Sequence, residues 1–375
     1  MKITDIKTLI VHSAMDNWVF TRVYTDEGIT GLGESSLEGR ESTVCAAIEA
    51  LKPYLVGKHP FDSELHFYRM FRDAYWGAGA ILSGALSAID GALWDIKGKA
   101  MGVPVYQLLG GKFRDKIRVY ANRWFFGAKT PEQLAERAKA TVSQGYTALK
   151  WDPFGLAEWE ISSDQMERCL EEVQAVREAV GSKVELLIEG HGRFNYNTAL
   201  KIAQELAPYK IFFFEEPLMP ENIDALGRLH DHSPVAIAAG ERFYTKYDFA
   251  QALRCNAIDY AQPDLRVTGG ITEAKKIAAL CESNFVPVVP HNIHGQVGTA
   301  MSLQLLAAIP NAAMLEYTVE QIPWKARLFS HVFEAENGYL KIPDRPGLGL
   351  EIDDKVAEEF PFRPQSLIEL MFENH

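Results

Sequence analysis

The pattern of apolar and polar positions divides the chain into two parts. Before about residue 115, three short runs with alternating apolar and polar residues predict β-strands: residues 7–12, 17–27 and 29–35. Residues 40–57 have apolar positions at helical spacing. Residues 80–101 are small or apolar around most of the helical circumference, which is typical of a buried helix. This part is expected to form an α+β domain.

After the glycine pair at residues 110–111 the pattern becomes regular, and a β-rich run, a loop and an amphipathic helix follow one another repeatedly. The β-rich runs are residues 117–122, 146–150, 184–189, 211–215, 235–241, 258–264, 286–291 and 312–316. Strands that alternate with helices in this way favour a closed parallel barrel over an open sheet. The rhythm ends near residue 331, and the tail is expected to pack back onto the first domain.

The composition is that of a compact globular enzyme. The 375 residues are 47% hydrophobic and 23% charged, with a net charge of −12 and no basic run, which argues against a nucleic-acid partner. The N-terminus lacks the apolar core of a signal peptide and no apolar run has membrane length, so we expect a cytoplasmic protein without a membrane partner. The four cysteines lack CxxC spacing, which predicts reduced thiols.

Ionisable residues stand at the ends of the last six predicted strands. Their separations are 26, 26, 23, 27 and 25 residues, each about one βα unit, so the side chains should meet at the C-terminal mouth of the barrel. These residues are Glu189, Glu215, Glu241, Asp264, His291 and Glu316. Any one alone is compatible with a helix cap, an ion pair or a hydrogen-bonded loop. Six in consecutive units indicate a site, and because converging carboxylates repel, a positive group is expected among them.

The first three of these carboxylates form an all-oxygen donor set, which predicts Mg²⁺ rather than zinc or copper. Open positions on such an ion would bind an anionic substrate through its own oxygens. Lys150, Arg193 and Arg242 are candidates for a second cation or a substrate contact, although each is equally compatible with a solvated position.

Acid–base chemistry is predicted from the histidines. Asp264 and His291 close neighbouring strands, so the carboxylate can orient the imidazole as a general base. His191 enters from the opposite part of the ring of strands and is a candidate second acid or base. A metal, a base and an acid together fit proton abstraction beside a carboxylate.

Motifs along the whole chain resemble those of the enolase superfamily, in its mandelate racemase subgroup: ELLIEGHGRF, FFFEEP, AAGERFYT, YAQPDLRVTGGITEAKKIA, VVPHNIHG and MLEY. The resemblance implies an α/β fold, a modified TIM barrel of (β/α)7β type, with an α+β capping domain formed by the N-terminal region and the C-terminal tail. The expected boundaries are residues 1–115 for the capping domain, 116–330 for the barrel and 331–375 for the tail.

Within the superfamily, LKWDPFG and IEGHGRFN are most similar to gluconate and galactonate dehydratases, which convert an aldonic acid to a 2-keto-3-deoxy acid. The resemblance implies Mg²⁺ as cofactor and a small anionic sugar acid as substrate, in a homo-oligomer. The implied roles are Mg²⁺ ligands for Glu189, Glu215 and Glu241, the base for Asp264 with His291, the acid that assists departure of the 3-hydroxyl for His191, and a hydrogen bond to the substrate carboxylate for Glu316.

Two departures from the subgroup matter. Many relatives carry Asp as the first ligand, where this chain has Glu189. Racemases of the subgroup carry a Lys-x-Lys pair after the second strand, whereas this chain has Asp152 two residues after Lys150, and Asp152 is a further candidate substrate contact. Because the second lysine is missing, dehydration is favoured over two-base racemisation.

The resemblance also indicates which loops contact the distal hydroxyls, at residues 13–20 and 68–79. The candidate contacts there are Asn17, Trp18, Tyr75 and Trp76, with domain-interface packing as the alternative for the tryptophans. His294 is either a substrate contact or a polar loop residue. Alternative functions are a sugar-acid epimerase or racemase, a cycloisomerase and a non-catalytic sugar-acid-binding protein. A metal-barrel hydrolase is disfavoured because the first barrel strand lacks a His-x-His pair.

Overall fold

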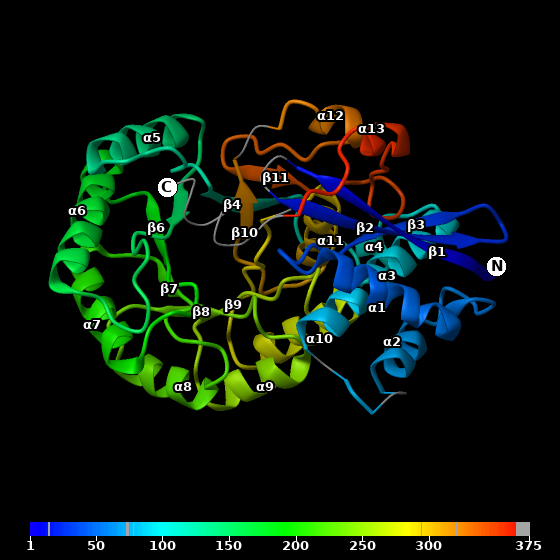
Figure 1. Ribbon diagram of the computed structural model, residues 1–375, viewed down its shortest axis with the longest axis horizontal. Coiled ribbons are helices and arrows are strands. Elements are labelled where there is room, and N and C mark those ends of the chain that lie inside the picture. The colour runs from blue at the N-terminus through cyan, green and yellow to red at the C-terminus, as the bar shows by residue number, and fades with distance from the viewer. Residues whose placement is uncertain (14–15, 73–74, 78, 294, 320–321, 365–375) are drawn as a thin grey trace.

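The computed structural model describes the chain except residues 14–15, 73–74, 78, 294, 320–321 and 365–375. An antiparallel sheet with packed helices lies beside a ring of parallel strands whose helices form the outer layer (Figure 1). The fold class predicted from the sequence is confirmed. None of the helices in the described part of the chain is long and apolar enough to cross a membrane.

The N-terminal region contains the predicted strands and helices together with two helices that were not predicted, at residues 63–72 and 105–108. Its sheet has the order β1-β2-β3, and its elements are β1 (Ile3–His12), β2 (Asn17–Thr25), β3 (Thr30–Glu34), α1 (Glu41–Leu55), α2 (Ser63–Arg72), α3 (Ala80–Met101) and α4 (Val105–Leu108). α3 packs directly on β3, where a Cβ atom at Gly33 would lie 1.9 Å from the carbonyl oxygen of Ala88. Only glycine permits this close approach between strand and helix.

Seven parallel strands form the ring, in the order β10-β4-β5-β6-β7-β8-β9. They are β4 (Lys116–Asn122), β5 (Ala148–Trp151), β6 (Glu185–Glu189), β7 (Phe213–Glu215), β8 (Ile237–Ala239), β9 (Tyr260–Ala261) and β10 (Leu315–Thr318). The helices around them are α5 (Pro131–Ser143), α6 (Ser163–Val180), α7 (Tyr196–Leu206) with the 3₁₀ turn η1 (Ala207–Tyr209), α8 (Ile223–His232), α9 (Lys246–Arg254), α10 (Gly270–Ser283) and α11 (Gln296–Ala307).

The predicted strand at residues 286–291 is reduced to single bridges. Val288 pairs with Ala261 on one side and with Ala312 on the other, so the ring continues from β9 toward β10. The run contains two prolines, which have no backbone N–H to donate, so a continuous ladder of hydrogen bonds cannot form.

The interior of the ring is packed with side chains, so any site must lie at its ends. These inward residues are Tyr120, Ala148, Leu187, Phe213, Ala238, Val289 and Met314. A larger apolar layer lies between the strands and the surrounding helices. The sequence pattern therefore positions the strand ends as the edge of a packed core.

The C-terminal segment connects both parts of the molecule. Its elements are α12 (Lys325–Leu328), β11 (Tyr339–Lys341) and α13 (Asp354–Glu358). β11 pairs antiparallel with the first half of β4. Asp95 of α3 accepts hydrogen bonds from the backbone N–H groups of Leu32, at 2.9 Å, and Leu348, at 2.8 Å, and so joins the capping sheet to the tail.

A buried aspartate links the capping domain to the barrel. Asp90 of α3 accepts hydrogen bonds from the hydroxyl and, at 2.9 Å, the backbone N–H of Thr272 in α10. Burial raises the pKa of Asp90 to about 7 from an ordinary value of 3.8. Between these values the folded chain holds a proton that the unfolded chain has lost, so stability falls as the pH rises.

We therefore expect Asp90→Asn to have a shallower pH dependence of stability than the wild type. The contribution of Asp90 to the free energy of unfolding should fall by about 1.4 kcal/mol per unit between about pH 4 and pH 7. Thermal denaturation of both proteins across this range measures the difference. Parallel curves would contradict a proton on Asp90.

Candidate active site

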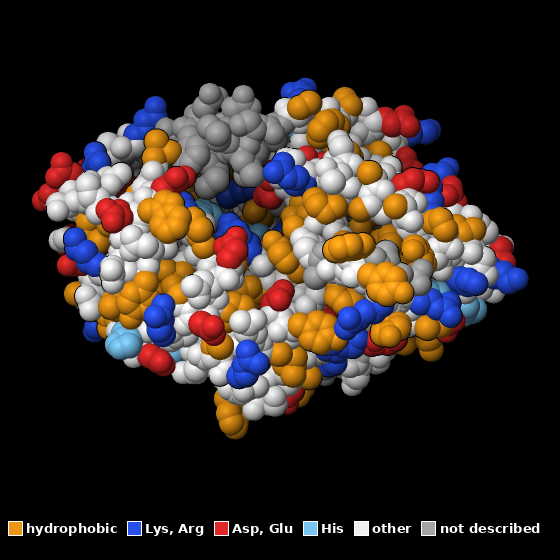
Figure 2. Space-filling model, turned by 60° about the horizontal axis from the view of Figure 1, so that its bottom comes forward, with side chains coloured by type: hydrophobic (Ala, Val, Ile, Leu, Met, Phe, Trp, Pro, Cys, Tyr) orange, Lys and Arg blue, Asp and Glu red, His pale blue; other side chains and the backbone are white. Residues whose placement is uncertain are grey.

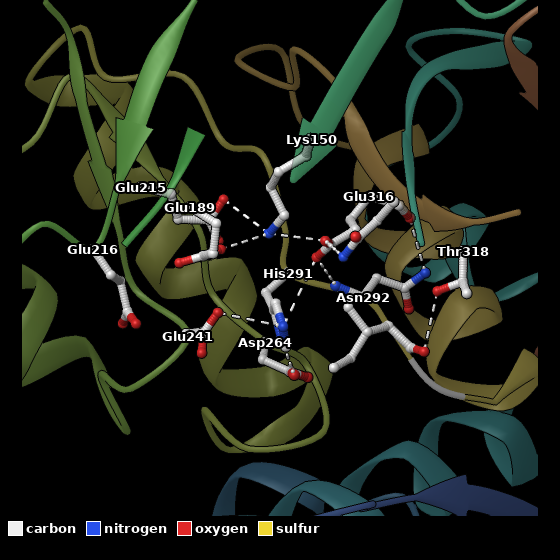
Figure 3. A network of polar contacts seen from close by, with 12 residues as sticks. Lys150, Glu189, Glu215, Glu216, Glu241, Asp264, His291, Asn292, Glu316 and Thr318 are labelled. Atoms are coloured by element: carbon white, nitrogen blue, oxygen red, sulfur yellow. Dashed lines mark hydrogen bonds and ion pairs between the residues drawn. The ribbon is translucent and has the colours of Figure 1, made fainter. Parts of the chain in front are cut away.

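The six predicted strand-end residues converge at the C-terminal end of the ring (Figure 3). A cavity of about 1180 Å³ opens there, and its lining includes Glu189, Glu241, Asp264 and His291. Glu215 and Glu316 are fully buried. Figure 2 shows a hollow in this face of the molecule with charged and histidine side chains around it. The βα repeat thus brings together residues that are far apart in the sequence.

Three carboxylates in this group have the geometry of a metal site. Ligand oxygens of Glu189, Glu215 and Glu241 all lie within 4.8 Å of one another. Oε1 of Glu215 is buried and has no hydrogen-bond partner among the described residues. An unsatisfied buried oxygen within an all-carboxylate set fits a hard divalent cation.

Lys150 at the end of β5 supplies the positive charge expected among these acids. Its Nζ lies 3.0 Å from Oε2 of Glu189, 2.9 Å from Oε2 of Glu215 and 2.9 Å from Oε1 of Glu316 (Figure 3). Burial lowers the pKa of Lys150, but the neighbouring carboxylates outweigh burial and hold that pKa well above its usual range. Lys150 is therefore a charged, buried part of the cluster rather than a solvated strand end.

The pKa values of the carboxyl groups are driven apart. Burial raises the pKa of Glu215 and Glu241, and the charge of Glu189 raises both further. Glu189 is also buried, but Lys150 and His191 outweigh burial and hold the pKa of this carboxyl below its usual range. A cation that binds here competes with protons on two of the three carboxyl groups.

His291 lies between two carboxylates. Its Nδ1 is 2.8 Å from Oδ2 of Asp264, and its Nε2 is 3.3 Å from Oε2 of Glu241 (Figure 3). The hydrogen bond to Asp264 places the proton of a neutral imidazole on Nδ1. Nε2 then carries the lone pair on the side of the carboxylate cluster.

Arg266, which the sequence interpretation missed, holds Asp264 from the other side. Its Nε donates to Oδ1 of Asp264 at 2.9 Å, and its Nη2 pairs with Oδ2. Burial raises the pKa of Asp264, but Arg266 and the hydrogen bond from His291 outweigh it and lower this pKa overall. The only sequence signal was an arginine two residues after the strand-end aspartate.

A second histidine–aspartate pair lies beside Glu189. Nδ1 of His191 is 2.6 Å from Oδ2 of Asp152, and Nη2 of Arg193 donates to both oxygens of that aspartate, at 2.8 and 2.7 Å. The backbone N–H of His191 donates to Oε1 of Glu189 at 2.9 Å. Two residues predicted as substrate contacts, Asp152 and Arg193, are thus the partners that orient His191.

The remaining predicted charged residues are also paired. Arg242 forms ion pairs with Glu216 and, at 3.2 Å, with Glu241. Glu316 accepts hydrogen bonds from Nδ2 of Asn122 at 2.8 Å and from the backbone N–H of Asn292 at 2.9 Å. The sequence did not indicate either asparagine, because their roles depend on how adjacent strand ends face one another.

The predicted capping-domain contacts lie elsewhere. Trp18 is buried in an aromatic cluster 5.8 Å from the ring centroids of both Trp324 and Phe329, which favours the packing alternative. Asn17 donates to Glu41, whereas Tyr75 and Trp76 are 96% and 86% exposed. None of these four predicted contacts is among the described cavity-lining residues, and His294 lies outside the described residues.

Other capping-domain residues reach the cavity instead. Asp16, Ser36, Leu37 and Glu38 are part of its lining. Oδ2 of Asp16 lies 3.0 Å from Nη2 of Arg123, which follows β4. Of the two loops predicted from the resemblance, residues 13–20 contribute Asp16 to the lining, whereas no described residue of 68–79 is part of it; Ser36, Leu37 and Glu38 belong to the segment after β3.

Comparison with known families agrees with this geometry. The model of the enolase C-terminal domain-like family matches residues 133–356, and that of the mandelate racemase / muconate lactonizing enzyme N-terminal domain matches residues 4–110. The chain belongs to the mandelate racemase / muconate lactonizing enzyme family. The resemblance drawn from the motifs is thereby confirmed.

Curated relatives of this family member carry dehydratase names. It is 38% identical to D-gluconate dehydratase from Thermoproteus tenax over 93% of this chain and 71% of that protein. It is 38% identical to D-galactonate dehydratase from Ralstonia pickettii, over 96% and 94% of the two chains. It is 35% identical to D-xylonate dehydratase from Haloferax volcanii, over 98% and 91%.

Solved structures of the family have the same fold. A mandelate racemase/muconate lactonizing enzyme from Sulfitobacter sp. superimposes with a TM-score of 0.93 at 31% identity, over 98% of this chain and 97% of that one. A member of the enolase superfamily from Salmonella Typhimurium gives a TM-score of 0.92 at 31% identity, over 96% and 98%. In this family member, Asp152 pairs with His191.

Proposed function

We propose that the protein is a Mg²⁺-dependent hydro-lyase that converts an aldonic acid of the gluconate or galactonate type to a 2-keto-3-deoxy acid. The observation that carries this proposal is the pair of histidine–aspartate units, His291 with Asp264 and His191 with Asp152, that adjoin one carboxylate cluster: His291 contacts Glu241, and the backbone of His191 contacts Glu189. The dehydratase names of the curated relatives support it.

Glu189, Glu215 and Glu241 are the residues that would hold the Mg²⁺. A cation held there would supply positive charge to stabilise the negative charge that develops on the substrate carboxylate as the α-proton leaves. Lys150 forms ion pairs with two of the three carboxylates, Glu189 and Glu215, and so holds these side chains in place. An anionic substrate then enters a site whose excess negative charge is compensated.

The proton transfers follow from the two histidines. Asp264 accepts a hydrogen bond from Nδ1–H of His291, which leaves the Nε2 lone pair to remove the proton from C2. His191 donates a proton to the 3-hydroxyl, the C3–O bond breaks, and water leaves. The resulting C2=C3 enol tautomerises to the 2-keto-3-deoxy acid. Asp152 and Arg193 hold His191 for this step.

Epimerisation is the second candidate, because histidines on two sides of a substrate can also exchange the α-proton between faces. A non-catalytic binding protein is less consistent with an intact His291–Asp264 pair. The deciding experiment is a screen of aldonic and aldaric acids with Mg²⁺ for 2-keto-3-deoxy products. His291→Asn and Glu215→Gln serve as inactive controls. Deuterium exchange from D₂O without keto product would establish epimerisation instead.

Removing the proposed acid should separate the two chemical steps. We expect His191→Asn to lower kcat for dehydration by about 100-fold, because the hydroxyl must then leave without a proton donor. Exchange of the α-proton with D₂O depends on His291 and should persist.

Product formation and deuterium incorporation are measured on the same samples. His232→Asn, at the exposed C-terminal end of α8, is the matched control and should retain both activities. Equal loss of dehydration and exchange in His191→Asn would contradict the assignment of His191 as the acid.

A further inference from the structure

Arg266 is a buried arginine that does not line the cavity. Its side chain is only 1% exposed, in the loop that follows β9. It binds Asp264 through three donors: the backbone N–H at 2.8 Å, Nε at 2.9 Å and Nη2. Because Asp264 Oδ2 also accepts from His291, the carboxylate is held between a guanidinium and the imidazole. The orientation of His291 thus depends on a group that cannot touch the substrate.

A capping-domain residue holds the turn at residues 295–298, which packs against this arginine. Glu34, the last residue of β3, is fully buried. Its Oε1 accepts from the backbone N–H of Gly295 at 2.9 Å, and its Oε2 accepts from that of Gly298 at 2.9 Å. These N–H groups belong to the start of α11, the helix that follows His291 in the chain.

The two charged side chains lie against the same turn. A Cβ atom at position 298 would lie 2.6 Å from Cδ of Arg266, and one at position 295 would lie 2.5 Å from Oε2 of Glu34. Both positions must therefore be glycine for the arginine and the glutamate to pack there. Burial raises the pKa of Glu34, and the charge of Arg266 opposes that rise.

We propose that Arg266 is a positioning residue for His291 and that Glu34 of the capping domain holds the turn at residues 295–298, which follows His291 and packs against Arg266. The base is then oriented only when the two domains are packed together. This inference rests on the proposed function in taking His291 as the base. It assigns the domain interface a part in the proton transfer, in addition to closing the cavity.

The test combines kinetics with a spectroscopic readout. Arg266→Gln should lower kcat by about tenfold to 100-fold while KM changes less than about threefold, because the base is misoriented and the substrate contacts remain. Arg266→Lys keeps the charge but not the two-pronged donor, and should recover part of the lost kcat. Long-range ¹H–¹⁵N spectra of histidine-labelled protein should show that His291 loses its predominant Nδ1–H tautomer in Arg266→Gln.

Glu34→Gln tests the proposed role of the domain interface, and it replaces Arg266→Gln as the test if that variant does not fold. It removes the charge but preserves the side-chain size, and should lower kcat by about threefold to tenfold with a partial change in the His291 tautomer. Arg254→Gln, at the exposed C-terminal end of α9, is the control and should match the wild type.

Unchanged His291 spectra in both variants would overturn the inference, even if activity fell, because the loss would then arise from stability alone. Full kcat in both variants would overturn it as well. The spectra do not require turnover, so they test the positioning role even if the wild type dehydrates none of the acids tested. A wild type that dehydrates none of the acids would overturn the proposed function, but not the positioning role of Arg266.

Discussion

Replacement of His291 by asparagine is expected to lower kcat for dehydration by about 10³-fold to 10⁴-fold. It should also abolish exchange of the substrate α-proton with D₂O, because both reactions need the same lone pair on Nε2. Asparagine can still hydrogen-bond to Asp264, so the buried carboxylate keeps a partner and the melting temperature should change little. Turnover, deuterium incorporation and thermal denaturation are measured on one preparation.

The chain contains a matched control for this experiment. His230 of α8 also pairs with an aspartate, since its Nε2 lies 3.1 Å from Oδ1 of Asp259. This pair is not part of the cavity lining among the described residues. His230→Asn should therefore keep full activity. If His291→Asn retained α-proton exchange, the base would have to be another group, and the proposed mechanism would be wrong.

The strand-end positions of the site could be predicted from the sequence because the βα repeat has a nearly constant length. Each unit returns the chain to the same rim, so Glu189, Glu215 and Glu241 fall together without any knowledge of packing. A different signal, small and apolar residues around most of the helix, predicted α3, and the structure confirms its bounds. Regular repetition is the property that makes such residues visible in one sequence.

The partners of those residues could not be predicted in the same way. Lys150 was a candidate cation, but the choice between a buried and a solvated lysine depends on its inward direction and on which strands flank β5. Arg266 and Glu34 meet only because β3 of the capping domain packs against the start of α11. For Trp18 the sequence left a substrate contact and domain-interface packing open, and the structure favours packing, because its ring is buried beside Phe329. Contacts that depend on the docking of two domains leave no periodic signal.

The electrostatic arrangement links these observations. The mouth of the ring concentrates carboxylates that would repel one another, and each is compensated from a different direction. Lys150 pairs with Glu189, Glu215 and Glu316, Arg266 pairs with Asp264, and Arg242 pairs with Glu241 and Glu216. Even so, Oε1 of Glu215 lacks a hydrogen-bond partner in the described part of the chain. The remaining negative charge of the carboxylate cluster therefore predicts a bound divalent cation.

Removal of Mg²⁺ is accordingly expected to abolish activity and to destabilise the protein, with a larger loss of stability at higher pH. The pKa values of Glu215 and Glu241 are raised by burial and by the charge of Glu189. Without the cation, the folded chain therefore holds protons that the unfolded chain has lost above about pH 4.5, and stability falls as the pH rises. The pKa of Glu189 is lowered, so this carboxyl group changes the stability only below about pH 4.5, where stability is lost as the pH falls.

Thermal denaturation with Mg²⁺ and with a chelator, at pH 5.5 and at pH 8, measures this effect. Saturation at about 100 times Kd stabilises by about 2.7 kcal/mol, and the shift should be larger at pH 8 because the ligands are then free of protons. Glu215→Gln should lose the Mg²⁺-dependent shift. Glu216→Gln is the matched neighbour, since Glu216 points away from the cluster toward Arg242, and it should keep the shift despite a lower starting stability (Figure 3). A melting temperature independent of Mg²⁺ at both pH values would contradict the assignment of this cluster as the metal site.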